Sequence, residues 1–175
     1  MKIFIGCSSK ENIDNVYKTS ATALANQLAQ NNHDLICGGT DGMMKLLHDA
    51  FLQNDRNVTL TGVNGYFEVK TTSSNIYFYD TIVERKQALT KLADILLFLP
   101  GGLGTLDEIF SFIESKRAKE HNKPIIIVNL NHYYDNLIEQ LNTMYHEQFA
   151  DASDAKYYYI TSNIEQTIQY LENLK

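Results

Sequence analysis

The chain has 175 residues and a mass of 20.0 kDa, about the size of one domain. Its formal net charge is −6 and it contains only three arginines, which disfavours a protein that tracks nucleic-acid phosphates. No apolar run approaches the ~20 residues of a membrane span, and the amino terminus lacks a signal-peptide pattern. We therefore expect a cytoplasmic protein with no nucleic-acid or membrane partner.

Short apolar runs alternate with stretches of helical period along the first half of the chain. Strand-like runs occur at residues 3–5, 35–37, 58–63 and 76–79. Apolar residues recur at helical spacing after the first two runs, over residues 17–28 and 43–51. A polar stretch, residues 64–75, separates the third run from the fourth.

The second half repeats this alternation. Helical spacing is found over residues 88–92, 106–113, 134–145 and 164–171, and strand-like runs at 95–99, 125–128 and 157–160. In this pattern Phe110 belongs to the apolar stripe of its helix, and Tyr157–Tyr159 form part of the core of the last strand. Continuously apolar strands between amphipathic helices indicate a parallel sheet covered on both faces. We predict a single doubly wound, Rossmann-like α/β domain over residues 1–175.

The glycines of the chain are concentrated at strand ends. Six of the nine lie in two short runs, residues 38–42 and 101–104. In doubly wound sheets, ligands bind outside the carboxyl ends of the strands. Both runs, the turn at residues 6–9 and the loop after Gly62 are therefore expected at the ligand-binding edge.

The second glycine run joins an apolar strand to an amphipathic helix. Gly102, Leu103, Gly104 and Thr105 would offer backbone N–H groups, and Thr105 a hydroxyl, to an anion such as a phosphate. A simpler interpretation is a tight turn in which Thr105 and Glu108 form a capping box. That interpretation leaves three glycines in four residues unexplained, so we favour a phosphate site. The spacing matches neither a dinucleotide-binding fingerprint nor a Walker P-loop.

Weaker signals come from the two other turns. Gly39 belongs to the first glycine run, where direct ligand contact and a simple strand–helix turn are both open. Ser8 and Ser9 end the first strand, where hydroxyl groups can bind a nucleotide. Cys7 and Cys37 show no metal-binding spacing, and we expect two buried, reduced thiols.

Arg85 has an unusual position for a cation. It begins a helix, where the helix dipole disfavours positive charge, and it is spaced with the apolar stripe. An inward arginine needs an anionic partner. Either an ion pair with Glu84 or Glu108, or a phosphate or developing negative charge, would satisfy it.

These residues together resemble the Lonely Guy (LOG) family, the cytokinin riboside 5′-monophosphate phosphoribohydrolases, which are often mislabelled as lysine decarboxylases. The resemblance rests on Glu84-Arg85-Lys86 and on a complete PGGxGTxxE string from Pro100 to Glu108. The chain departs from the family pattern at Ile82-Val83, where Met-His is usual, and in its first glycine run.

The resemblance implies hydrolysis of the N-glycosidic bond of a nucleoside 5′-monophosphate, AMP or an N6-substituted AMP, to free base and ribose 5-phosphate. Arg85 and Glu108 would be catalytic. The nucleotide would be bound by the residues of the matching motifs: Ser8, Ser9, Gly39, Glu84, Lys86, Gly102, Leu103, Gly104 and Thr105. A carboxylate and an arginine suffice for this reaction, so we expect neither a metal nor a cofactor, and the family resemblance suggests a homodimer. The alternative is a non-catalytic protein that binds a nucleotide or a molybdenum-cofactor-type phosphate ligand.

Overall fold

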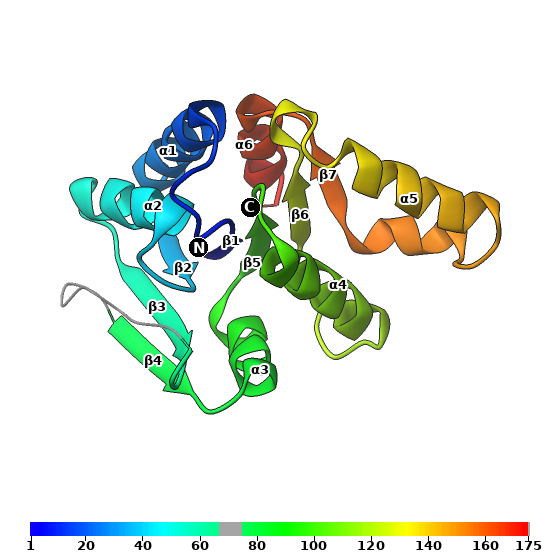
Figure 1. The fold of residues 1–175 in the computed structure, drawn as a ribbon, viewed down its shortest axis with the longest axis horizontal. Helices are drawn as coiled ribbons and strands as arrows, with labels where there is room; N and C mark the ends of the chain where they lie inside the picture. The colour runs from blue at the N-terminus through cyan, green and yellow to red at the C-terminus, as the bar shows by residue number, and fades with distance from the viewer. Residues whose placement is uncertain (67–74, 175) are drawn as a thin grey trace.

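The computed structural model describes residues 1–66 and 75–174, and its centre is one seven-stranded sheet (Figure 1). The strand order is β4-β3-β2-β1-β5-β6-β7, and every neighbouring pair is parallel. The strands are β1 (Lys2–Gly6), β2 (Asp34–Cys37), β3 (Val58–Val63), β4 (Asn75–Tyr79), β5 (Ile95–Phe98), β6 (Ile125–Val128) and β7 (Tyr159–Thr161). The predicted doubly wound α/β fold is confirmed.

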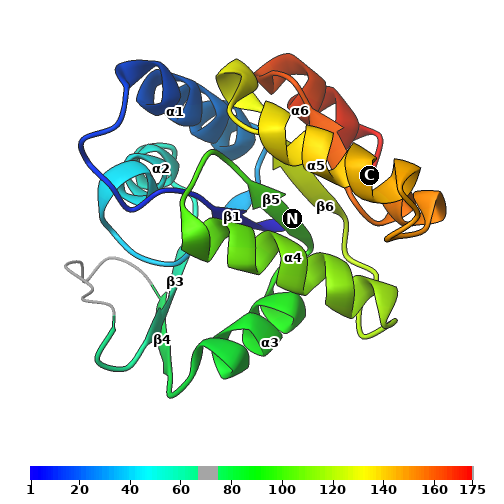
Figure 2. The same cartoon turned by 45° about the vertical axis from the view of Figure 1, so that its right-hand side comes forward.

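Helices cover both faces of the sheet (Figure 2). Buried side chains of α1 (Asn15–Gln30), α2 (Gly42–Gln53) and α6 (Ile164–Glu172) share one apolar cluster with Ile3 and Ile5 of β1. The opposite cluster contains Phe4 together with side chains of α3 (Ile82–Leu92), α4 (Leu103–Arg117) and α5 (Asp135–His146). Successive side chains of a strand point to opposite faces, so β1 contributes to both clusters.

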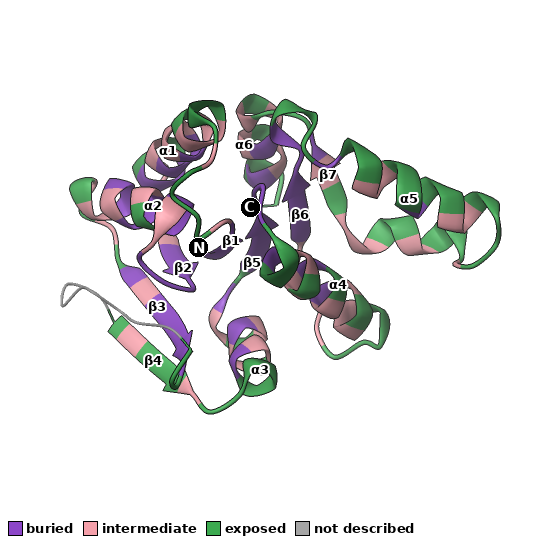
Figure 3. Cartoon of the chain, in the orientation of Figure 1, coloured by how far each residue is buried: buried purple, intermediate pink, exposed green. Residues whose placement is uncertain are grey.

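The central strands are buried and the edge is not (Figure 3). The side chains of β1, β5 and β6 are almost entirely buried, whereas Tyr77 and Phe78 of β4 are exposed. Cys7 and Cys37 are buried free thiols, as expected. Among the residues described, no helix is long and apolar enough to cross a membrane.

Two expectations from the sequence were wrong in detail. Phe110 is 42% exposed, and Phe112, two residues later, fills the core position at 1% exposure. The last strand begins at Tyr159, because residues 152–157 form the 3-10 helix η2 (Ala152–Tyr157) that precedes it. Tyr159 is partly exposed and stacks on Tyr170 of α6, with ring centroids 4.0 Å apart. Local apolar spacing does not distinguish a core aromatic from one that packs at the rim.

The strand order reverses at β1, which lies between β2 and β5. The chain passes from β1 to β2 in one direction, while β5 pairs with the other side of β1, with Gly6 opposite Phe98. The loops after β1 and β5 therefore diverge and leave a crevice at the carboxyl ends of these strands. This crevice is where a ligand is expected in a doubly wound sheet.

Candidate active site

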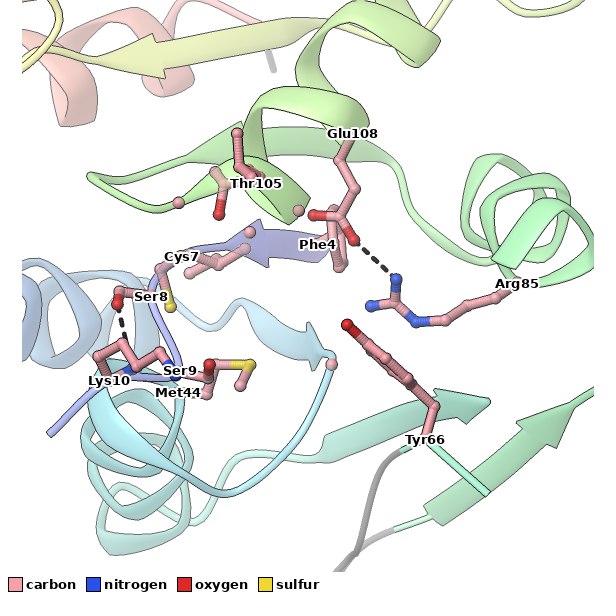
Figure 4. Close-up of a pocket in the computed structure, with 16 residues that line it drawn as sticks. Phe4, Cys7, Ser8, Ser9, Lys10, Met44, Tyr66, Arg85, Thr105 and Glu108 are labelled. Carbon is pink, nitrogen blue, oxygen red and sulfur yellow. Dashed lines mark hydrogen bonds and ion pairs between the residues drawn. The ribbon is translucent and has the colours of Figure 1, made fainter. Parts of the chain in front are cut away.

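A cavity of about 320 Å³ opens at this crevice (Figure 4). Its walls come from five parts of the chain that are distant in sequence: β1 and its loop, the start of α2, the loop after β3, α3, and the start of α4. The lining residues are Phe4, Ile5, Gly6, Cys7, Ser8, Ser9, Lys10, Gly38, Met44, Tyr66, Arg85, Gly102, Leu103, Gly104, Thr105 and Glu108.

Arg85 and Glu108 face each other in this cavity (Figure 4). Nη1 of Arg85 donates to Oε1 of Glu108 at 2.6 Å, and Nε of Arg85 donates to the backbone oxygen of Thr61 at 2.9 Å. The guanidinium carbon lies 5.9 Å from the centre of the Phe4 ring. Arg85 is only 5% exposed. The inward arginine inferred from the sequence is therefore held by a carboxylate, a carbonyl and an aromatic face.

The environment of Glu108 changes its acidity. Burial raises the pKa of Glu108 above the ordinary glutamate value, and the neighbouring Arg85 opposes this shift. A carboxyl group with a raised pKa in a cavity, next to a specific charged partner, is typical of a functional site.

The second glycine run forms an open helix start rather than a capped one. Gly102 is the N-cap of α4 and has no side chain that could cap the helix. Thr105 lies inside the first turn, and Glu108 is engaged with Arg85, so the alternative capping box is not formed. The first N–H groups of a helix have no partner within the helix and carry the positive end of its dipole. Residues 102–105 line the cavity, so this helix start is suited to binding an anion.

The three glycines of this turn have different structural roles. A Cβ added to Gly101 would overlap Oγ1 of Thr105, so the fold itself needs this glycine. A Cβ on Gly102 or Gly104 would meet no atom of the described residues within 4 Å. Packing within the protein does not require these two glycines, whereas a ligand that approaches the backbone closely would.

Two adjacent tyrosines support this turn from behind. Tyr133 donates its hydroxyl hydrogen to the carbonyl of Gly101 at 2.6 Å, and Tyr134 donates to that of Leu99 at 2.8 Å. Ser8 N–H also donates to the carbonyl of Pro100 at 3.2 Å, which ties the turn to the loop after β1. The helix start is thus fixed before any ligand binds.

The other two turns contribute differently. Ser8 and Ser9 line the cavity, and Oγ of Ser8 accepts a hydrogen bond from the backbone of Lys10. Gly38 also lines it, and a Cβ there would lie 2.7 Å from Nη2 of Arg85, so this glycine makes room for the arginine. Gly39 is not among the lining residues and lies against the side chain of Met44.

Two residues of the Glu-Arg-Lys string are placed outside the cavity lining. Glu84 accepts hydrogen bonds from the backbone of Asp80 and Thr81 and completes a capping box at the start of α3. Nζ of Lys86 lies within 3.1 Å of both carboxylate oxygens of Asp107. Of the two carboxylates considered for Arg85, the structure selects Glu108.

Several lining residues were not singled out from the sequence. Phe4 and Tyr66 carry no motif that distinguishes a cavity wall from an ordinary core or loop residue. Figure 4 shows Tyr66 directed toward Arg85 from the loop after β3. Residues 67–74 of that loop, which was predicted at the ligand edge, lie outside the described residues. Within the described parts of the chain, no group of three or more His, Cys, Asp or Glu side chains is arranged to hold a metal ion.

The chain is similar to a protein family, to curated relatives and to solved structures. A family model described as "Possible lysine decarboxylase" matches residues 44–171. A cytokinin riboside 5′-monophosphate phosphoribohydrolase from Arabidopsis thaliana is 28% identical over 175 residues, covering 98% of this chain and 82% of the relative. A probable enzyme of the same name from Oryza sativa subsp. japonica is 28% identical over 152 residues, covering 85% of this chain and 62% of the relative.

Solved structures show the same fold. The Moco carrier protein from Chlamydomonas reinhardtii superposes with a TM-score of 0.73 at 15% identity, covering 99% of this chain and 96% of that one. The molybdenum cofactor binding protein from Rippkaea orientalis gives a TM-score of 0.70 at 16% identity, covering 99% and 94%. At these identities the likeness concerns the fold alone.

Proposed function

We propose that this chain is a nucleoside 5′-monophosphate phosphoribohydrolase. The chain belongs to the family described as "Possible lysine decarboxylase", which includes the Lonely Guy proteins. It hydrolyses the N-glycosidic bond of AMP or of an N6-substituted AMP and releases the free base and ribose 5-phosphate. The curated relatives carry the name of this activity. None of these curated relatives is named as a decarboxylase.

The observation that carries the proposal is that one cavity holds both an anion-binding helix start and a buried carboxylate–arginine pair. The 5′-phosphate binds to the N–H groups of residues 102–105. This contact places the ribose over Arg85 and Glu108, which line the same cavity.

The chemistry follows from this placement. As the bond between C1′ and the base breaks, its electrons leave with the base, which takes up a proton, and positive charge develops at C1′. The carboxylate of Glu108 stabilises that charge and orients the water whose oxygen then bonds to C1′. This water releases one proton as its oxygen becomes the hydroxyl group of ribose 5-phosphate, which balances the proton that the departing base takes up. Arg85 keeps the carboxylate in position, and a negatively charged phosphate is attracted to the same guanidinium.

Ser8 and Ser9 are proposed to contact the nucleotide from the loop after β1, and Gly39 to shape the adjoining wall through Met44. We further propose that residues 1–175 act as one nucleotide-binding domain, that the enzyme is a cytoplasmic homodimer, and that it works without nucleic-acid or membrane partners.

The deciding experiment is chromatographic detection of free base after incubation with a panel of nucleoside 5′-monophosphates that includes AMP and isopentenyl-AMP. A nucleosidase of known activity serves as the positive control. Release of base by the wild-type protein and not by Glu108→Gln supports the proposal. Tight binding of a nucleotide with no base released would instead support the non-catalytic alternative.

A further inference from the structure

Two adjacent ion pairs join α3 to α4. Consecutive residues of α3, Arg85 and Lys86, meet consecutive residues of α4, Glu108 and Asp107. The first pair lines the cavity and the second does not. Nζ of Lys86 lies 3.0 Å from Oδ2 and 3.1 Å from Oδ1 of Asp107.

Ser111, one helical turn after Asp107, completes the second pair. Nζ of Lys86 donates to Oγ of Ser111 at 2.7 Å, and Oγ of Ser111 donates to Asp107 at 3.3 Å. The side chain of Lys86 is 17% exposed. The ammonium group is thus surrounded by three oxygens of one helix face, which makes this contact more specific than an isolated surface pair.

We propose that Lys86 and Asp107 are positioning residues whose ion pair fixes α3 against α4 and so holds Glu108 within reach of Arg85. This inference rests on the proposed function and adds to it a role for the lysine of the Glu-Arg-Lys string. Because each residue of the outer pair directly adjoins one of the inner pair, a shift between the helices moves Glu108 away from Arg85. A misplacement of about 1 Å can cost a large factor in rate.

The outer pair also acts on Glu108 through charge. Among the residues that the structure describes, the charged and titratable groups around Glu108 are Arg85 and Lys86 from α3, Asp107 from its own helix and Cys7 from the loop after β1. Lys86 lowers the pKa of Glu108, and Asp107 raises it. Through charge alone, removal of one or the other would therefore give shifts of opposite sign, whereas a greater distance between Glu108 and Arg85 raises the pKa in both cases.

The test compares Lys86→Met, Asp107→Asn and the double variant. The pKa of Glu108 is followed by carbon-13 NMR of labelled glutamate carboxyl groups, with Glu108→Gln identifying the signal. We expect this pKa to rise in Lys86→Met and also in Asp107→Asn, because Glu108 then lies farther from Arg85, although loss of the Asp107 charge alone would lower it. In the double variant the two charge effects oppose each other, and the greater distance from Arg85 should still raise the pKa. A fall of the pKa in Asp107→Asn, or no shift in any variant, would show that the pair does not position Glu108 and would overturn the inference.

Kinetics separate positioning from ligand contact. In Lys86→Met we expect kcat for base release to fall about tenfold, with KM changed less than about threefold. KM changes little because the substitution leaves the proposed phosphate site at residues 102–105 intact. Lys86→Arg retains the charge and should restore most of kcat. A rise in KM at unchanged kcat would instead mean that Lys86 binds the substrate and would overturn the inference.

Two controls complete the design. Ser111→Ala removes a hydrogen bond from the same cluster without removing a charge, so it should leave the pKa of Glu108 in place. Arg117→Met removes a cation from the far end of α4 and should do the same. If Lys86→Met does not fold, Asp107→Asn must still raise the pKa and Lys86→Arg must leave it unchanged. The NMR titration needs no substrate, so failure of this inference is distinguishable from failure of the proposed function.

Discussion

The guanidinium of Arg85 lies between Glu108 and Gly38. Its Nη1 donates to Glu108 at 2.6 Å, while its Nη2 lies 2.7 Å from where a Cβ on Gly38 would stand. The carboxylate and the glycine follow β5 and β2, the two strands that flank β1 on opposite sides. The geometry of this ion pair therefore depends on the absence of a side chain at Gly38 as well as on the two charged side chains.

The first prediction concerns the charged pair itself. Glu108→Gln should lower kcat for base release by about 10²–10⁴-fold, because a neutral amide stabilises positive charge at C1′ far less than a carboxylate does. Arg85→Ala should lose a similar factor. Base release is measured by chromatography, and circular dichroism confirms that each variant is folded. A wild-type rate in either variant would remove that residue from the mechanism.

The second prediction concerns pH and stability. Because the pKa of Glu108 in the folded protein is raised above 4.5, the folded state binds this proton more tightly than the unfolded chain does. Its contribution to the free energy of unfolding is complete below the ordinary glutamate pKa and is lost as the pH rises through the raised value. The free energy of unfolding of the wild type relative to Glu108→Gln should therefore fall across that window. Urea denaturation at a series of pH values measures this difference, and a rise with pH would contradict it.

The third prediction separates the glycines of the phosphate turn. Gly104→Ala should keep or slightly raise the free energy of unfolding, by up to about 1 kcal/mol, because the added Cβ enters open space and alanine favours a helix. It should nevertheless weaken nucleotide binding about tenfold or more, since the methyl group would meet the phosphate. Thermal unfolding and calorimetric titration with AMP report the two effects.

Gly101→Ala is the matched comparison for Gly104→Ala. Its Cβ would overlap Oγ1 of Thr105, so this variant should lose about 1–3 kcal/mol of stability. Equal loss of stability in both variants would show that the two glycines share one structural role. It would weaken the case for a phosphate site at residues 102–105.

The fourth prediction tests the space that Gly38 leaves for Arg85. In Gly38→Ala the nearest atom is the end of a flexible side chain, so the guanidinium can move and the fold should survive. Its movement breaks the contact with Glu108, and kcat should fall about tenfold or more. Gly6→Ala would instead press a methyl group against the buried ring of Phe98, at 2.7 Å, and should be unstable. Thermal unfolding and kcat are compared for both variants, and a normal kcat in folded Gly38→Ala would refute the argument.

The fifth prediction concerns the support behind the turn. Tyr134→Phe should cost about 1 kcal/mol of stability, because it leaves the carbonyl of Leu99 without its hydroxyl donor in a buried place. Tyr133→Phe, whose ring is more exposed, should cost less stability and act mainly on KM through Gly101. Chemical denaturation and steady-state kinetics distinguish the two effects. Equal stability losses would argue against the difference in burial as the cause.

Much of the fold was predictable from local patterns. Alternating apolar strands and amphipathic helices repeat along the chain, and each run is recognisable without its neighbours. At Phe110 and Tyr159, where burial depends on how the edge of the core packs, the same patterns wrongly predicted core positions. Helical periodicity identifies the apolar face of a helix. How many residues of that face become buried depends on the packing of neighbouring elements.

By itself, the sequence determined the parallel sheet, the edge at which a ligand is expected, the glycine-rich helix start and, through the family resemblance, the two residues proposed for catalysis. The tertiary structure decided which carboxylate pairs with Arg85 and that Lys86 contacts Asp107. It also decided which glycines are required by packing within the protein and which face open space. Arg85 and Glu108 are 23 residues apart and meet only because β5 and α4 pack beside α3. Strand and helix formation depends on nearby residues, whereas the partner of a buried charge depends on which distant elements the folded chain brings together.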